Sequence, residues 1–180
     1  MYMKTASAIS RLALLAILVA TPASAADGIY METNPQIEGD SITNGFIDQI
    51  ELSSIQFGGF NDACSGGKGG AVTGELSISK LTDQATVDLL QALKNQSQYT
   101  ITISMTRNAG SPTPATYQQY VLTNAIISSY AGSDGGGGGG GAESLTISYS
   151  SIEIIYSIYD NMGVLQGTES VVFTPSACVN

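Results

Sequence analysis

The chain has 180 residues, of which 15 are acidic and only 6 basic, and it contains no histidine. The formal net charge of −9 disfavours nucleic acid and anionic membrane surfaces as partners. Without histidine the chain has no imidazole base, no histidine-ligated zinc and no Ser-His or Cys-His nucleophile pair.

Residues 1–25 have the pattern of a secretory signal peptide. Lys4 and Arg11 precede the apolar run 12–20, and small residues suited to a signal peptidase follow it. This run is too short to span a bilayer as a stable helix. Cleavage would remove two basic residues and no acid, changing the net charge from −9 to −11. Residues 26–180 are long enough for one domain with its own core, which we expect to be secreted or periplasmic in a bacterium, with no membrane contact after cleavage.

Alternating apolar and polar residues predict strands along most of this domain. In Tyr99–Thr106 every second residue is apolar, and the same period of two appears in 50–57, 72–79 and 145–158. A period of two indicates strands with one buried face. We therefore expect a mainly β protein.

Three Ser-Ser pairs lie inside or beside such stretches, at Ser53-Ser54, Ser128-Ser129 and Ser150-Ser151. The apolar parity flips across the first and the last of them. A slip of one residue would turn every side chain to the wrong face, so a continuous strand needs a bulge or a bend there. Bends of this kind occur at the corners of small barrels. Alternatively, one strand ends at the pair and another begins.

One segment has a helical period instead. Apolar residues recur at four-residue spacing from Ala85 to Leu93, which predicts a short amphipathic helix at about residues 83–94. Thr82 or Asp83 could cap its start. A single helix between strands must lay its apolar stripe on a sheet. The predicted fold is a small antiparallel β-barrel of two packed sheets with one flanking α-helix.

The two cysteines, Cys64 and Cys178, are expected to form a disulfide, because an exported chain meets an oxidising environment. Free thiols or a bridge between subunits are the alternatives. Cys64 lies in a long glycine-rich connection, 58–71, and a second glycine run occupies 135–141. Connections of this length in a compact domain are often functional or disordered.

The sequence offers little for catalysis or cofactor binding. Gly66–Gly70 surrounds Lys68 with glycines, but no Ser or Thr follows the lysine and no helix begins there, so a phosphate loop is not predicted. A Ser-Lys dyad with Lys68 or Lys80 is possible in principle, although solvated surface charges are the simpler interpretation of both. Asp160–Gly163 is better explained as an Asx-type turn than as a calcium loop. We expect no enzyme activity, no cofactor and no metal.

The order of these elements resembles the haemolysin-coregulated protein (Hcp) family, the tube protein of bacterial type VI secretion systems. The resemblance covers about residues 28–173, and its most telling pieces are three short stretches: "SISKLTDQAT", "LTNAIISSY" and "ESLTISYSSIEIIY". It implies a small antiparallel β-barrel with one helix, assembled into six-membered rings that stack head to tail into a hollow tube. Members bind small effectors in the ring lumen and are not themselves enzymes.

The resemblance also implies a contact between subunits. The glycine-rich connection would reach over a neighbouring subunit or ring, with these residues as the contact loop: Gly58, Gly59, Phe60, Asn61, Asp62 and Lys68. The implied partners are other copies of the chain in a hexameric ring, secretion-system proteins and small effectors. The signal peptide and the cysteine pair depart from the family pattern. The alternative function is a monomeric secreted β-barrel module that recognises a glycan or a protein.

Overall fold

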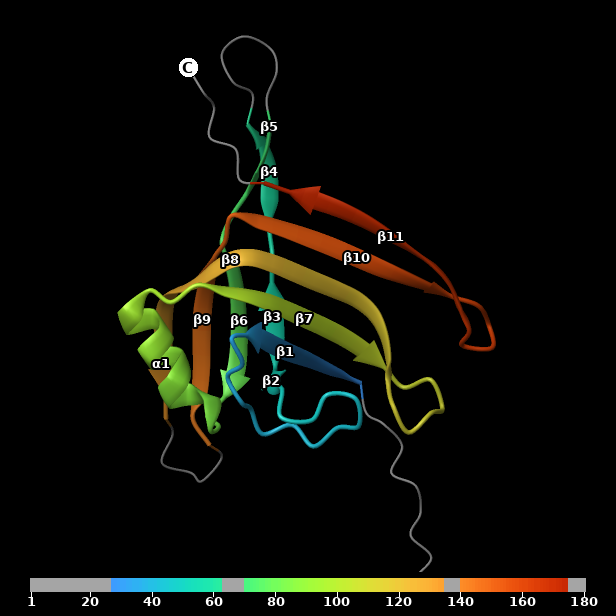
Figure 1. Cartoon of the computed structure of the whole chain (residues 1–180), viewed down its shortest axis with the longest axis horizontal. Helices are drawn as coiled ribbons and strands as arrows, with labels where there is room; N and C mark the ends of the chain where they lie inside the picture. Colours follow the sequence, from blue (N-terminus) through green and yellow to red (C-terminus); the bar gives the residue numbers. More distant parts are fainter. Residues whose placement is uncertain (1–26, 63–69, 135–139, 175–180) are drawn as a thin grey trace, which may run out of the picture.

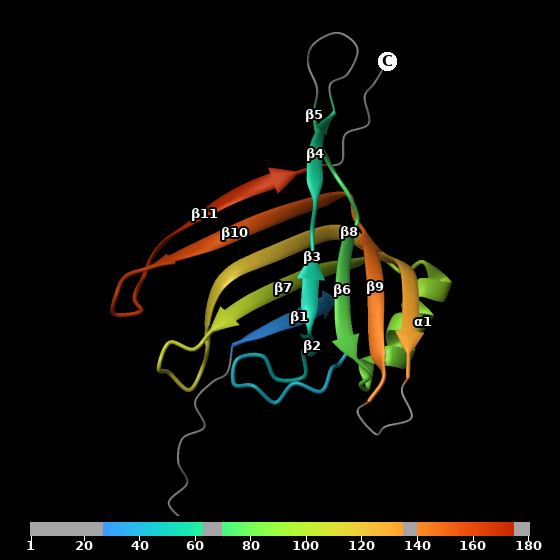
Figure 2. The same ribbon diagram turned by 180° about the vertical axis from the view of Figure 1, so that it is seen from behind.

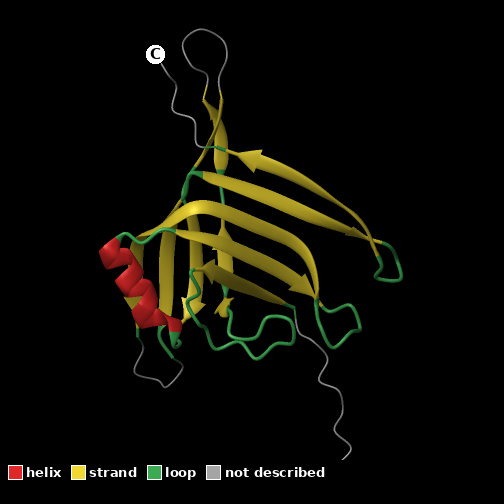
Figure 3. Cartoon of the chain, in the orientation of Figure 1, coloured by secondary structure: helices red, strands yellow, loops and turns green. Residues whose placement is uncertain are grey.

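The computed structural model describes residues 27–62, 70–134 and 140–174. Antiparallel strands and one helix make up most of these residues (Figures 1 and 3). The elements are β1 (Gly28–Asn34), β2 (Ile50–Leu52), β3 (Ser54–Gln56), β4 (Gly59–Asp62), β5 (Gly70–Thr73), β6 (Leu76–Leu81), α1 (Ala85–Asn95), β7 (Tyr99–Arg107), β8 (Ala115–Ser133), β9 (Ala142–Ser148), β10 (Ser151–Tyr159) and β11 (Leu165–Phe173).

Two sheets share the long strand β8. The first half of β8 pairs with β7 on one side and β10 on the other, so that sheet A runs β2-β1-β7-β8-β10-β11. Its second half pairs with β9, so that sheet B runs β8-β9-β6-β3. The two packed sheets and the single helix confirm the predicted fold class.

The corner between the sheets lies where β8 passes Asn124, which has a φ of 50°. Opposite it, the chain leaves β9 and enters β10 through Ser150. The Asn124 side chain donates to Ser150 Oγ at 3.0 Å, and Ser150 donates through both N and Oγ to the Thr123 carbonyl. The predicted irregularity at Ser150-Ser151 is therefore the corner where the chain passes from β9 in sheet B to β10 in sheet A.

The other two Ser-Ser pairs also mark irregularities. The register of β8 against β9 shifts between Ile127 and Ser129. Ser53 separates β2, which pairs with β1, from β3, which pairs with β6, and its amide donates to the Ser79 carbonyl at 2.7 Å. The chain thus passes from sheet A to sheet B at Ser53. Because β2 and β3 do not pair with each other, the sheet is not closed, which corrects the expectation of a closed barrel.

The core lies between the sheets. Its fully buried side chains come from alternate positions of most strands, and those with at most 1% exposure include Met31, Ile50, Leu76, Ile78, Ile101, Ile103, Leu122, Leu145, Ile147 and Ile152. Helix α1 adds Ala85, Leu89 and Ala92 to this cluster and lies across one end of the sheets (Figure 1). The period of two thus places one continuous apolar cluster between the sheets.

Helix α1 begins two residues later than predicted. Asp83 Oδ1 accepts a hydrogen bond from the Ala85 amide at 2.9 Å, so Asp83 serves the first turn from just outside the helix. At the other end, Gln96 adopts the left-handed conformation with φ 52° and stops the helix after Asn95, where a stop was predicted.

Candidate functional site

The β10–β11 hairpin carries sheet A beyond the core, and we call it the arm. Among the strands that the structure describes, β11 pairs with β10 alone, so its other side is an open edge within the described residues (Figures 1 and 2). Open edges present unpaired backbone N–H and C=O groups to any neighbouring strand. The turn at the end of the arm is the predicted Asx turn, because Asp160 Oδ1 accepts from the Met162 and Val164 amides at 2.8 and 2.9 Å.

One face of the arm is an uncovered continuation of the core. In β10, Ile152 and Ile154 face the core cluster, and the same face continues with Tyr156 and Ile158. Tyr156 is 50% exposed and Ile158 40%. Val171 of β11, the cross-strand partner of Ile154, is 47% exposed. We call Tyr156, Ile158 and Val171 the arm face; apolar surface of this kind, contiguous with a core, is typical of association sites.

The predicted contact loop, 58–71, is in part a hairpin. Gly59–Asp62 forms β4 and pairs with β5, and the Gly74 amide closes its base by donating to the Gly58 carbonyl at 3.0 Å. The hairpin projects away from both sheets at the end opposite the β1–β2 connection (Figure 1). The expectation of an irregular loop is thus corrected for Gly59–Asp62, and Lys68 and the two cysteines lie outside the described residues. A contact of this hairpin with a neighbouring copy stays a prediction.

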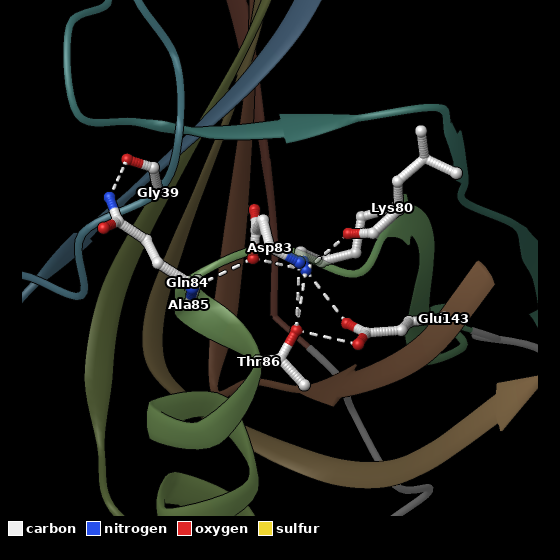
Figure 4. Close-up of polar contacts among 8 residues, drawn as sticks. Gly39, Lys80, Asp83, Gln84, Ala85, Thr86 and Glu143 are labelled. Carbon is white, nitrogen blue, oxygen red and sulfur yellow. Dashed lines mark hydrogen bonds and ion pairs between the residues drawn. The ribbon is translucent and has the colours of Figure 1, made fainter. Parts of the chain in front are cut away.

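A buried charge cluster joins β6, α1 and β9 (Figure 4). Lys80 is 1% exposed and Glu143 3%. Lys80 Nζ donates to Asp83 Oδ1 at 2.7 Å, to Glu143 Oε2 at 2.9 Å and to the Leu81 carbonyl at 2.8 Å. Thr86 Oγ1 donates to the other Glu143 oxygen at 2.7 Å. We call Lys80, Asp83, Thr86 and Glu143 the Lys80 cluster.

The electrostatics of the cluster favour ionised groups. Burial alone would raise the pKa of Glu143, but hydrogen bonds from Lys80 and Thr86 and the charge of Lys80 outweigh it, so the pKa is lowered. The pKa of Tyr130 is raised, first by burial and then by the charge of Glu143 and a hydrogen bond to it. Lys80 Nζ lies between two carboxylates, at 2.7 Å from Asp83 Oδ1 and 2.9 Å from Glu143 Oε2.

This geometry overturns the interpretation of Lys80 as a solvated surface charge. It also gives no support to a Ser-Lys dyad, because the described hydrogen-bond partners of Lys80 Nζ are Asp83, Glu143, Thr86 and the Leu81 carbonyl, and none of them is a serine. A signal for the burial was present in the sequence: Leu76, Ile78 and Lys80 share one parity, and the strand buries all three. Within the described ranges, no group of three or more metal-ligating side chains comes together, and no helix is long and apolar enough to cross a membrane.

The sequence matches the family model described as "Type VI secretion system effector, Hcp" over residues 30–156, well over half of the chain. The chain belongs to the Hcp family. The Hcp match includes every strand of sheets A and B except β11, the start of β1 and the end of β10. The predicted resemblance is thereby confirmed. No curated protein matches the sequence.

Solved Hcp structures share the fold. A structure titled as a type six secretion system protein aligns with a TM-score of 0.72 and 23% identity, covering 83% of this chain and 96% of that one. Hcp1 from Salmonella typhimurium aligns with a TM-score of 0.67 and 20% identity, over 83% and 95% of the two chains. A type VI secretion system effector from Yersinia pestis aligns with a TM-score of 0.66 and 16% identity, over 81% and 98%. At these identities the likeness shows the Hcp fold, and the chain spans nearly the whole length of each relative.

Proposed function

We propose that this Hcp-family chain is a non-enzymatic, self-assembling tube subunit that forms six-membered rings stacking head to tail. The observation that carries the proposal, beyond family membership, is the arm: an open sheet edge whose apolar face continues the core without cover. Covering that face and pairing that edge would both lower the free energy of the assembled form.

The arm fits a ring better than a closed dimer. It extends from one side of the subunit, and helix α1 lies on the opposite side (Figures 1 and 2). A head-to-tail ring joins two different surfaces of each copy, which a projecting arm supplies when it docks on a distant part of the next copy. The comparisons give no support to the alternative of a monomeric glycan-binding or protein-binding module.

The absence of enzyme activity is part of the proposal. The chain lacks histidine, and its buried lysine is neutralised by two carboxylates. The proposal also includes the signal peptide, which would export the subunit, and a Cys64–Cys178 disulfide, which would stabilise it in an oxidising compartment. Partners are then other copies of the chain, secretion-system proteins and small effectors held in the ring lumen.

Sedimentation of the purified mature protein under oxidising conditions tests the assembly. We expect a mass of six chains, and association that strengthens with salt, because each copy carries a large negative charge that salt screens. A strict monomer at high protein concentration would refute the proposal.

Substitutions on the arm test which surface assembles. Ile158→Lys or Val171→Lys should give folded monomers, because each places a charge in the proposed contact. The matched control is Ile42→Lys in the connection between β1 and β2, away from both the arm and α1, where the isoleucine is 91% exposed. This control should leave the ring mass unchanged. Rings that persist in both arm variants would place the contact elsewhere.

A further inference from the structure

The Lys80 cluster holds three separate elements at one point. Lys80 lies one residue before the end of β6 and Glu143 one residue after the start of β9, and the two are cross-strand partners. Asp83 and Thr86 lie on either side of the start of α1. Thr86 Oγ1 donates to Glu143 and accepts from the Asp83 amide at 3.3 Å, so the first helical turn is tied directly to the strand pair (Figure 4).

Apolar packing alone holds α1 weakly. Of its 11 residues only Ala85, Leu89 and Ala92 are buried, and two of these three are alanines with little side-chain area to remove from water; Leu93 packs half-buried against the same cluster. Leu90 and Val87 are exposed. A helix of this length is marginal on its own in water. The polar ties at its first turn therefore decide whether it stays docked.

We propose that the Lys80 cluster is an acid-sensitive latch that holds α1 on the sheets and releases it locally when Glu143 gains a proton. Protonation of Glu143 removes one of the two carboxylates that compensate Lys80, which leaves the buried ammonium poorly paired. Local opening of α1 relieves this by exposing Lys80 to water, while the sheets keep their own core.

The titratable groups around the cluster determine how pH acts on the latch. Tyr130 of β8 also faces Glu143. Beside Asp83 opens a cleft of 280 Å³ that Asp40 and Glu51 also line, and the Asp83 side chain is 10% exposed, so a proton can approach the cluster at Asp83 while Lys80 and Glu143 stay buried behind it. Because the folded pKa of Glu143 is below its unfolded value, the latch is fully present at neutral pH and is lost as pH falls through that folded pKa.

Hydrogen exchange followed by mass spectrometry tests the latch in the full-length protein. Labelling at about pH 7 and about pH 3, with times scaled to intrinsic exchange rates, compares the peptide covering α1 with that covering β7. We expect protection of α1 to fall severalfold more than that of β7 in acid, up to the roughly twentyfold that one carboxyl with an ordinary pKa of about 4.3 can lose at that pH. Equal losses in the two peptides would overturn the proposal.

Two variants separate the latch from general acid sensitivity. Glu143→Gln should raise α1 exchange already at neutral pH and flatten its pH dependence, with β7 still protected. Glu169→Gln removes an exposed carboxylate from β11 and should behave as wild type. An α1 peptide in Glu143→Gln that keeps the wild-type pH dependence would refute the assignment. If this variant fails to fold, the wild-type pH series still decides.

Discussion

Replacing Lys80 by methionine removes the cation and keeps most of the side-chain volume. Glu143 then loses the one cation that pairs with it in the described part of the chain and keeps the hydrogen bond from Thr86, in a site where its side chain is 1% exposed. Breaking a buried pair by removing one partner costs about 3–5 kcal/mol, because a charge stays buried without compensation. Since domains of this size are stable by about 5–15 kcal/mol, Lys80→Met should lose about a fifth or more of the total.

Urea unfolding at matched protein concentration measures this loss, as a lower midpoint with an unchanged slope. The control is Lys94→Met, which removes an exposed lysine from the last turn of α1 and should change stability by less than about 0.5 kcal/mol. Adding Glu143→Leu to Lys80→Met should recover much of the loss, because an apolar pair replaces the buried ions. A loss below about 1 kcal/mol in Lys80→Met would refute the reasoning, since it would mean that water reaches the cluster freely.

Three further changes probe other parts of the fold. Ile103→Ala in β7, where the isoleucine is fully buried, should cost about 2–5 kcal/mol in urea unfolding, and a loss near zero would show that the core is loose there. Cys64→Ser should lower stability by up to about 4 kcal/mol if Cys64 and Cys178 are bridged within one chain, and a thiol assay should count free thiols only in the variant. Unchanged stability with two free thiols in the wild type would contradict the bridge. Deleting three glycines from 135–139 should leave the thermal midpoint within about two degrees, because loop closure depends weakly on length, and a drop of ten degrees would show that the run is structural.

The sequence predicted the sheet corners better than the strands beyond them. A parity flip at a Ser-Ser pair is a local signal, because a one-residue slip cannot be hidden in a half-buried strand. Strand β11 gave no such signal: in Leu165–Phe173 the residues do not alternate, and seven of its nine residues are exposed. Because neither face of β11 is buried over most of its length, its sequence is not constrained to alternate apolar and polar residues.

The burial of some polar residues was also not predicted from the sequence. The period in β7 predicts one apolar face, yet Ser104 and Thr106 of the other face are also buried, at 5% and 3% exposure. Both are satisfied across strands, since Ser104 Oγ accepts from Gln119 Nε2 at 3.0 Å and Thr106 Oγ1 from the Gly28 amide at 3.1 Å. Burial of such groups depends on partners that are distant in the chain, which a local pattern does not contain.

Lys80 shows both what a local pattern predicts and what it leaves out. Its parity placed it on the core side of β6, but a lysine is buried only when its charge is matched, and its partner Glu143 lies 63 residues away along the chain. Only the pairing of β6 with β9 brings the two together. The family resemblance, by contrast, rested on the order of elements over the whole chain and so survived these local errors.

The Lys80 cluster also explains how the fold tolerates seven consecutive glycines. Directly after the run, the Gly141 carbonyl accepts from the Thr82 amide at 2.8 Å, and two residues later Glu143 is fixed by Lys80. A Cβ on Gly141 would lie 2.5 Å from Thr82 Oγ1, so any side chain there forces Thr82 to shift. Gly140, directly before it, has a φ of 74°, a left-handed conformation that favours glycine. The last two glycines are therefore suited to the backbone that leads into β9, and Lys80 fixes the register of β9 at Glu143. For this reason we expect changes of length before Gly140 to leave that register unchanged.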